Sequence, residues 1–392
     1  MARNAAIPPL LKDLNQRTVL ETIRASAPVS RAEISRMVGI SKPTVSLAIL
    51  SLLDAGLVRE AAEGPDGPSY GAVFFEPVPE AALVLGFDLG ARFLRGAICD
   101  LRGETRARQD VEVMGSDAEN VLDVIASLRL RLVEAAGLAD DLIDSVVVGV
   151  PGVVDAETGQ IDLATSVPGL EGGTFRSALS DRLDLPVTLE NDVNLAALGE
   201  HWQGVARGVD DFVFLSIGTG MGAGLVLNGE LHRGHHGAAG EVDFALVGLG
   251  QDVDPCAGAI SAYAARLVAE RGAETDTMLR QPFDARAIFA AARAGDALAQ
   301  DIVDEVARRI ALHVVPIAAV TDVSLAVLGG GLGANGDLLL RPVRELLGSW
   351  IPYPPQVDVS SLGEAAVLTG ALAIGLRTAL DNVFDERPRR AG

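Results

Sequence analysis

A glycine-rich stretch in the middle of the chain constrains the fold most. It runs SIGTGMGAGLVLNGELHRGHHGAAGE over Ser216–Glu241. The apolar run Val213–Ile217 has β-branched members and predicts a buried strand. Four glycines at alternate positions follow: Gly218, Gly220, Gly222 and Gly224. They remove side chains from a turn, which lets backbone N–H groups approach an anion or a second strand closely. A flexible linker or a chance dinucleotide-like match would also contain such glycines, but the apolar strands on both sides argue against a linker.

A polar triplet lies a short way before this stretch. Glu190, Asn191 and Asp192 follow the apolar run Val187–Leu189, so they stand at the end of a predicted strand. Hydrogen-bond acceptors and an amide donor at a strand end suit a polyhydroxylated ligand, and a carboxylate there can act as a general base. Glu241, at the end of the glycine-rich stretch, is expected to face the same ligand-binding cleft as this triplet.

The motifs END-V-N-LAALGE, GTG-M-GAG and G-AAGE resemble those of the ROK family, whose members are repressors, sugar kinases and uncharacterised reading frames. The resemblance extends over essentially the whole chain. It implies an α/β actin-like (ribonuclease H-like) fold of two lobes with a sugar in the cleft, behind an N-terminal winged helix-turn-helix. It makes Asn191, Asp192, Glu241 and Gly152 the candidate ligand-binding residues. Asp192 would be the catalytic base if the protein is a kinase.

We expect a winged helix-turn-helix domain in residues 1–80, the first lobe in 81–210 and the second lobe in 211–392. Apolar residues at helical spacing predict a first helix from about Leu10 to Ala25. Ser30 and Glu33 have the spacing of a capping box for a second helix. A glycine turn then leads to a third helix, capped by Ser41 with a proline in its first turn.

Two helices joined by a glycine-containing turn, the second with a short polar face, predict DNA binding. The expected DNA contacts are Arg31, Arg36, Ser41, Lys42, Thr44 and Ser46. Residues 56–59 and 73–75 would pair as the wing. The wing tip, residues 63–68, carries no base, so minor-groove contact by an arginine-rich tip, usual in the family, is in doubt. A generic three-helix oligomerisation domain would have the same apolar stripes and caps.

The phosphate-binding motif of the family's kinases is altered here. Those kinases carry Asp-x-Gly-Gly-Thr, and this chain has Asp88-Leu89-Gly90-Ala91-Arg92. The methyl group of Ala91 reduces backbone access, and Arg92 replaces the hydroxyl that would serve phosphate and Mg²⁺. We therefore expect a protein that is not an enzyme and does not bind ATP. We expect Arg92 to form a salt bridge with a neighbouring acid.

The zinc ligands of the family are replaced as well. Phe244 stands at the family's histidine, and Asp252, Asp254 and Ala259 stand at its three cysteines, so we expect no zinc and no other cofactor. Ser261 replaces a sugar-binding glutamate, which with Phe244 changes the hydrogen-bond inventory of the pocket. A different metal site would need three nearby histidines: His232, His235 and His236. Histidines on a polar loop are more often solvated, so we expect no metal there.

Charge is unevenly spread along the chain. Residues 1–80 hold 8 Lys or Arg and 9 Asp or Glu, whereas residues 81–392 hold 24 and 44. An acidic body repels nucleic acid, so DNA contact must come from a local face of the N-terminal domain. The 2 cysteines form no disulfide framework, residues 1–10 lack the features of a signal peptide, and no apolar run reaches the roughly 18 residues of a membrane span. These features indicate a cytoplasmic protein without a membrane partner.

The sequence therefore predicts a DNA-binding transcriptional regulator of carbohydrate-metabolism genes, a repressor in the simplest form. Its partners would be a double-stranded operator, a sugar or sugar phosphate as effector, and a second copy in a homodimer or tetramer. The alternative is a ROK sugar kinase with an appended DNA-binding domain, which Asp192 and the GTGMGAG turn favour. A third hypothesis, a ligand-independent DNA-binding scaffold, rests on Phe244 and Ser261.

Overall fold

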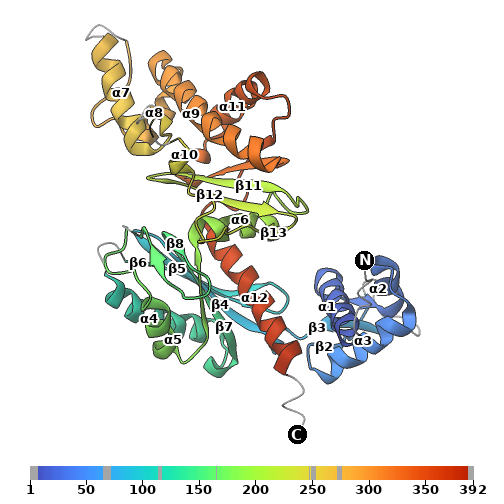
Figure 1. Ribbon diagram of the computed structural model, residues 1–392. Helices are drawn as coiled ribbons and strands as arrows, with labels where there is room; N and C mark the ends of the chain where they lie inside the picture. Colours follow the sequence, from blue (N-terminus) through green and yellow to red (C-terminus); the bar gives the residue numbers. More distant parts are fainter. Residues whose placement is uncertain are drawn as a thin grey trace.

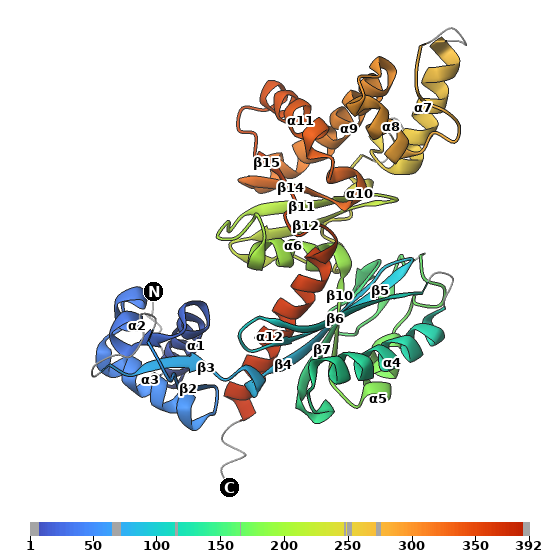
Figure 2. The same ribbon diagram turned by 180° about the vertical axis from the view of Figure 1, so that it is seen from behind.

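The computed structural model describes residues 8–64, 72–113, 117–164, 166–246, 248, 253–271 and 276–386. This part of the chain forms an N-terminal head and a body of two stacked lobes (Figure 1). A long helix, α12 (Ala366–Glu386), runs from between the lobes across the first lobe toward the head. Figure 2 shows the same arrangement from behind, with most helices of each lobe on the outer face of its sheet.

The head contains the expected three helices, α1 (Pro8–Ser26), α2 (Arg31–Val38) and α3 (Lys42–Asp54). Ser30 and Glu33 form the expected capping box at the start of α2. Gly39 ends α2 with a left-handed conformation, φ +69°, and the Ser41 side chain accepts from the backbone N–H of Thr44 at the start of α3. The axes of α2 and α3 differ by 117°, which is the geometry of a helix-turn-helix.

Three short antiparallel strands complete the head. Strand β3 (Phe74–Pro77) lies between β1 (Val29–Ser30) and β2 (Val58–Glu60). The pairing of β2 with β3 is the expected wing. Of the wing tip, Glu63 and Gly64 are described and residues 65–68 lie outside the described part of the chain.

Each lobe contains a five-stranded sheet, and the two sheets have the same strand order. The first has the order β10 (Val187–Asn191), β7 (Ile143–Val150), β4 (Leu83–Leu89), β5 (Phe93–Asp100), β6 (Thr105–Glu112). The second has the order β15 (Gln356–Val359), β14 (Leu325–Gly329), β11 (Phe212–Ile217), β12 (Met221–Leu227), β13 (Glu230–Leu231). In both, three successive strands form an antiparallel meander and two later strands add in parallel beside the first. This repeated topology confirms the actin-like, two-lobed fold.

Helices cover the outer faces of both sheets. The first sheet buries its core against α4 (Ala118–Ala136) and α5 (Phe175–Leu183). The second carries α7 (Ala257–Arg271), α8 (Ala285–Arg293), α9 (Ala297–Thr321), α10 (Gly330–Gly333) and α11 (Gly336–Trp350). A two-stranded ribbon, β8 (Val153–Val154) with β9 (Ile161–Asp162), extends from the end of β7. Short 3₁₀ turns lie at η1 (Pro79–Ala81), η2 (Asp140–Leu142), η3 (Val242–Phe244) and η5 (Gly363–Ala365).

Two helices join the lobes. Helix α6 (Asp192–Gln203) packs on β11 and β12 of the second sheet, and α12 packs on β4 and β7 of the first. The two helices cross closely, because a Cβ built on Gly370 would lie 1.9 Å from the backbone oxygen of Leu195, and one on Gly199 would lie 2.2 Å from that of Ala366. Of the ranges expected from the sequence, 81–210 includes α6 and 211–392 includes α12, so each range contributes a helix that packs on the other lobe's sheet.

One local expectation differs from the structure. Gly222 and Gly224 belong to strand β12 and not to a turn. A Cβ on Gly224 would lie 2.7 Å from Cβ of Ala197, so the missing side chain allows α6 to approach the strand. Helix α9 continues through Pro316 to Thr321, although a proline removes one backbone hydrogen bond from a helix. The apolar side chains on both sides of the proline are buried, and their packing outweighs this loss.

One helical stretch of the described chain, residues 363–382, is long and apolar enough to cross a membrane. More than half of its apolar window is buried inside the protein, against α6 and the first sheet. This burial is typical of a core helix of a globular protein.

Candidate functional site

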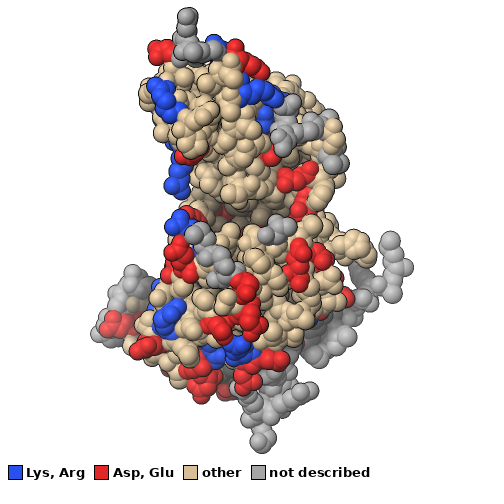
Figure 3. All heavy atoms as spheres, turned by 90° about the vertical axis from the view of Figure 1, so that its left-hand side faces the viewer, with Lys and Arg blue, Asp and Glu red and all other residues tan. Residues whose placement is uncertain are grey.

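A hollow separates the two lobes in the space-filling view, and acidic side chains cover much of the lower, first lobe around it (Figure 3). The ends of β4 and β10, the start of α6 and the segment before η3 bring their polar side chains to this cleft. A buried aspartate lies at its base. Asp88, on β4, accepts from Nη1 of Arg95 on the neighbouring strand at 3.1 Å. Burial raises the pKa of Asp88 to about 6 in spite of this ion pair.

Asp192 is the most perturbed carboxylate of the cleft. It is the first residue of α6, and one of its oxygens accepts from the backbone N–H of Val193 at 2.8 Å. Burial, followed by the charge of Asp88 and to a smaller extent that of Glu241, raises the pKa of Asp192 to about 7. Burial and then the charge of Asp243 raise the pKa of Glu241. Three carboxylates thus share one electrostatic environment, which suits binding of sugar hydroxyls or transfer of a proton.

The raised carboxyl pKa values predict a pH-dependent stability. Between the ordinary aspartate pKa of 3.8 and about 7, Asp192 holds a proton in the folded protein that it has lost in the unfolded chain. The free energy of unfolding therefore falls as the pH rises through this range. We compare the free energy of unfolding of Asp192→Asn with that of the unmodified protein. We expect the variant's advantage to be about 3 kcal/mol larger at pH 8 than at pH 5. Urea unfolding at both pH values measures this, and an equal difference at the two would contradict it.

Asn191 and Gly152 lie in direct contact. The Asn191 side chain donates through Nδ2 to the backbone oxygen of Gly152 at 2.8 Å and accepts through Oδ1 from the backbone N–H of Asn194 at 2.9 Å. Asn191 is thus the N-cap of α6, and one N–H of its amide remains for a ligand. Gly152 has φ +91°, and a Cβ there would lie 2.4 Å from the backbone oxygen of Asp162. The structure therefore brings together the predicted ligand residues, with Asn191 partly committed to holding the helix.

An ion pair that no sequence pattern indicated lies behind the site. Glu190 is buried and accepts from Nε of Arg233 at 2.7 Å and from Nδ2 of Asn194 at 3.0 Å. Arg233 belongs to the segment after β13, so the pair joins that segment to the end of β10 in the first sheet. A Cβ on Gly237, in the same segment, would lie 2.4 Å from the backbone oxygen of Val154. The acidic residue before the Asn-Asp pair is thus a fixed support and not a free acceptor.

The altered phosphate motif is engaged within its own lobe. Arg92 forms the expected salt bridge, with Nε 3.2 Å from the Glu112 carboxylate on β6, and its guanidinium carbon lies 5.0 Å from the centre of the Phe93 ring. The backbone N–H of Gly90 donates to the backbone oxygen of Phe93 at 3.0 Å. Both the cation and this amide therefore have partners in the strand turn.

The second lobe keeps a separate pocket of about 640 Å³ beside the glycine turn. Gly218, Thr219 and Gly331 form one side of it, and Phe289 lies on another. By the resemblance to kinases, adenosine would lie against the turn at residues 329–333, which contributes Gly331 to this pocket. Space beside that turn is thus present on the second lobe, whereas the phosphate motif on the first lobe is altered.

Within the described part of the chain, no group of three or more His, Cys, Asp or Glu side chains could hold a metal ion. Asp252 lies outside that part. His235 and His236 contact each other edge to face, with ring centres 4.4 Å apart. Burial raises the pKa of the Cys256 thiol, which disfavours the thiolate that zinc requires. Phe244 is exposed, so its ring does not line a closed zinc site.

On the head, the predicted DNA-binding residues differ in accessibility. Arg36 and Lys42 are exposed. The guanidinium of Arg31 is half-buried over the Phe75 ring, 4.7 Å from its centre. The hydroxyls of Ser41 and Thr44 lie 2.8 Å apart at the start of α3. Arg31 and the Ser41–Thr44 pair therefore help to build the head, and Lys42 is the freest of the predicted contacts on α3.

Two leucines that the sequence analysis missed lie on the open face of α3. Leu47 is 68% exposed and Leu50 is 51% exposed. They follow Pro43 at helical spacing, while the opposite side of the helix is buried in the head. The sequence does contain a signal for them, because both leucines fall on the predicted solvent face of the helix that follows the helix-turn-helix turn.

Two models of known protein families match this chain. A model described as the ROK family matches residues 84–378, which is most of the chain. The chain belongs to the ROK family. A second model, described as winged helix-turn-helix DNA-binding, matches residues 12–59 of the head. Both expectations from the sequence are thereby confirmed.

Individual ROK relatives fall into repressors and kinases. A xylose repressor of Caldicellulosiruptor bescii is 28% identical over 383 residues, which cover 93% of this chain and 96% of that protein. A glucokinase of Streptomyces coelicolor is 28% identical over 311 residues, covering 74% of this chain and 96% of the kinase. Among solved structures, a ROK family transcriptional regulator described as a homolog of the E. coli MLC protein has a TM-score of 0.79 at 22% identity, covering 96% and 98%. A ROK hexokinase from Thermus thermophilus has a TM-score of 0.63 at 27% identity, covering 76% and 99%.

Proposed function

We propose that this ROK protein is a sugar-responsive transcriptional repressor of carbohydrate-metabolism genes, located in the cytoplasm. The observation that carries the proposal is the combination of a helix-turn-helix head with a cleft that keeps Asn191, Asp192 and Glu241 but has Ala91 and Arg92 in the phosphate motif. The xylose repressor of C. bescii supports it, since that match covers nearly the whole of both chains. By this similarity a pentose such as xylose is the first effector to test.

The proposed DNA-reading element is α3. Its exposed face offers Lys42 for a phosphate and Leu47 and Leu50 for apolar contact with thymine methyl groups in the major groove. Two heads in a homodimer would bind two half-sites of a pseudo-palindromic operator about one helical turn apart.

We expect the two kinds of contact to respond differently to substitution. Lys42→Ala should weaken binding to any duplex and reduce the slope of log affinity against log salt by about one. Leu47→Ala should weaken binding to the operator by roughly 1 to 3 kcal/mol and leave binding to unrelated DNA unchanged. Fluorescence anisotropy at several fixed salt concentrations measures both. Leu14→Ala, at an equally exposed leucine of α1, is the control and should change neither.

The sugar would act by favouring one arrangement of the lobes. Asp192 begins α6 and Glu364 precedes α12, so both helices that join the lobes start near the cleft carboxylates. A sugar that binds one lobe arrangement more tightly shifts the population toward it, and the size of the shift is limited by the difference in affinity. The far ends of α6 and α12 lie beside the head, where such a shift would change the spacing of paired heads.

The experiment that tests this function is operator binding by fluorescence anisotropy, with DNA flanking the protein's own gene and a panel of sugars and sugar phosphates at fixed salt. Release of tightly bound DNA by one compound supports the repressor. Tight binding that no compound changes supports the ligand-independent scaffold. Absence of any specific site in the genome rejects the proposal.

The retained pocket on the second lobe favours one alternative, a sugar kinase with a DNA-binding head. Such an enzyme would use Asp192 as the base that removes a proton from a sugar hydroxyl. Its signature is sugar-dependent release of ADP from ATP that is lost in Asp192→Asn. We propose that neither ATP nor a metal ion serves as a cofactor, so ADP release at the level of buffer alone is the expected result.

A further inference from the structure

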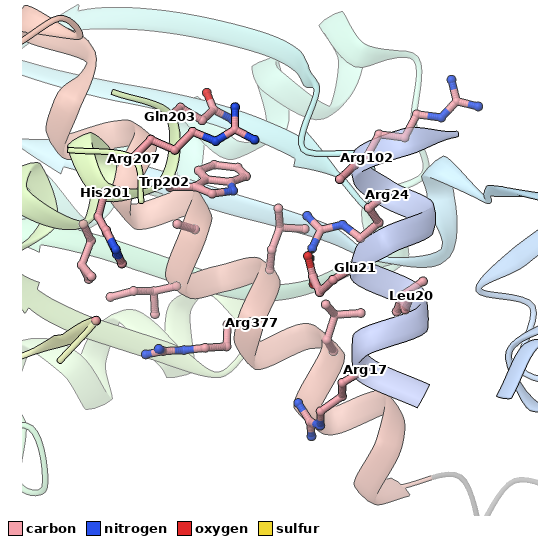
Figure 4. A pocket seen from close by; sticks show the side chains of 17 residues that line it. Arg17, Leu20, Glu21, Arg24, Arg102, His201, Trp202, Gln203, Arg207 and Arg377 are labelled. Carbon is pink, nitrogen blue, oxygen red and sulfur yellow. Dashed lines mark hydrogen bonds and ion pairs between the residues drawn. The ribbon is translucent and has the colours of Figure 1, made fainter. Parts of the chain in front are cut away.

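A pocket distinct from the sugar cleft lies where the head meets the body (Figure 4). Its volume is about 720 Å³, which is in the range of small-molecule sites. Four elements line it: α1 of the head, the turn between β5 and β6, the end of α6, and the second half of α12. Hydrogen bonds and an ion pair hold its walls together. Arg24 of α1 donates from Nε to the backbone oxygen of Leu101 at 2.6 Å, and Arg17 of α1 pairs with Asp381 of α12.

The charge of this pocket is opposite to that of the protein. Five arginines and one glutamate line it, in a chain whose net charge is −21. Three of these arginines are held by acids outside the pocket: Arg17 by Asp381, Arg102 by Glu76 at 3.4 Å and Arg377 by Glu230 at 3.5 Å. Positive charge concentrated in a concave surface of an acidic protein attracts an anion.

Two other guanidinium groups are available to such an anion. Figure 4 shows Arg24 and Arg207 directed toward the space beside the Trp202 indole. The Arg24 side chain is only 10% exposed, and it bonds Glu21 through Nη1 at 2.6 Å, so its position is fixed while Nη2 has no acceptor among the described residues. Arg207 also bonds no acceptor within the described part of the chain. A guanidinium pairs well with phosphate oxygens because several N–H groups lie in one plane.

The rest of the pocket is apolar and aromatic. Trp202 is held on one edge, since a Cβ built on Gly103 would lie 3.1 Å from its Cζ2. Leu20, Ile374 and Leu376 also line the pocket, and the hydrophobic cluster of the head continues into α12 beside it. A planar group can stack on an indole, and the apolar side chains exclude water from it.

We propose that this pocket binds a phosphorylated small molecule with a planar ring, its phosphate on Arg24 and Arg207 and its ring against Trp202. The ligand contacts the head through α1 and the body through α6 and α12. It therefore binds best when head and body are docked as they are here, and it stabilises that arrangement. Any effect on operator affinity rests on the proposed repressor function, whereas binding itself does not.

Trp202 provides a direct readout, because the chain contains only 2 tryptophans and the other, Trp350, lies at the end of α11. In the full-length Trp350→Phe protein, without DNA, Trp202 fluorescence is titrated with uridine 5′-monophosphate, with uridine and with inorganic pyrophosphate. We expect a saturable change with the nucleotide and at least about tenfold weaker binding of uridine, which lacks the phosphate. Pyrophosphate should compete with the nucleotide.

Substitutions locate the site. Arg207→Gln, at an exposed residue, should weaken nucleotide binding about tenfold without affecting folding, and Arg24→Gln should weaken it at least as much. Arg341→Gln, at an exposed arginine of α11, is the matched control and should change nothing. No saturable signal in the millimolar range overturns the proposal, as does binding that survives Arg207→Gln. Loss of the signal in Asp192→Ala would place the ligand in the sugar cleft. A lower operator affinity of Arg207→Gln with a smaller salt slope, in the absence of nucleotide, would instead make this arginine a contact to DNA phosphates.

Discussion

Replacing Gly370 by alanine should destabilise the protein by about 3 kcal/mol or more. The added methyl group would lie 1.9 Å from the backbone oxygen of Leu195 and 3.0 Å from the backbone nitrogen of Gly199. Neither atom is the end of a flexible side chain, so α6 and α12 must move apart. Because these helices carry the contacts between the two sheets, their separation loosens both lobes. Urea unfolding measures the change in the free energy of unfolding.

The chain offers a matched control in another helix. Gly348 in α11 is exposed, and a Cβ there would meet no atom within 4 Å. Gly348→Ala should therefore stabilise the protein by about 0.5 to 1 kcal/mol, through the higher helix propensity of alanine. Equal effects of the two substitutions would show that the close crossing of α6 and α12 does not exist in solution.

Asp192→Ala should abolish the response to the effector while leaving operator binding intact. The Asp192 carboxyl group would hydrogen-bond the sugar hydroxyls, and its loss is expected to weaken sugar affinity by about 10- to 100-fold. Asp192 lies in the cleft and not on the head, so affinity for DNA without sugar should stay the same. Anisotropy with operator DNA and increasing sugar measures both quantities in one titration.

Asp141→Ala, at an exposed aspartate of η2, serves as the control for the loss of one negative charge. It should respond to sugar as the unmodified protein does. A sugar response that survives in Asp192→Ala would move the effector site away from the cleft. Equal loss of operator binding in the absence of sugar would instead indicate damage to the whole fold.

Local patterns were sufficient to predict the strands and the head. The apolar runs Val213–Ile217 and Val187–Leu189 gave strands that differ from the observed ones only at their ends, and the capping box and Ser41 cap were visible in four-residue windows. The resemblance in the END, GTG and GAAGE motifs supplied the order of the lobes. The resemblance also predicted that the carboxylates of Asp192 and Glu241 lie in one cleft.

Pairings between distant residues could not be predicted in this way. Glu190 and Arg233 are 43 positions apart, and nothing in the periodicity of either segment indicates that they form a buried ion pair. The N-cap role of Asn191 was hidden because the same amide suits a sugar and a helix start. The placement of α12 on the first sheet also depends on tertiary packing, since its Ala and Leu pattern fits a helix on either lobe.

The position of α12 has a consequence for synthesis on the ribosome. Chains emerge from the N-terminus and domains tend to fold in that order. The head and the strands of the first sheet appear early, yet α12, which packs on that sheet and extends the apolar cluster of the head, follows the whole second lobe. A chain interrupted after the second lobe's strands would therefore carry a first lobe whose inner sheet face is uncovered. We infer that nascent chains expose this face until α12 arrives, which makes it a natural target for chaperones during translation.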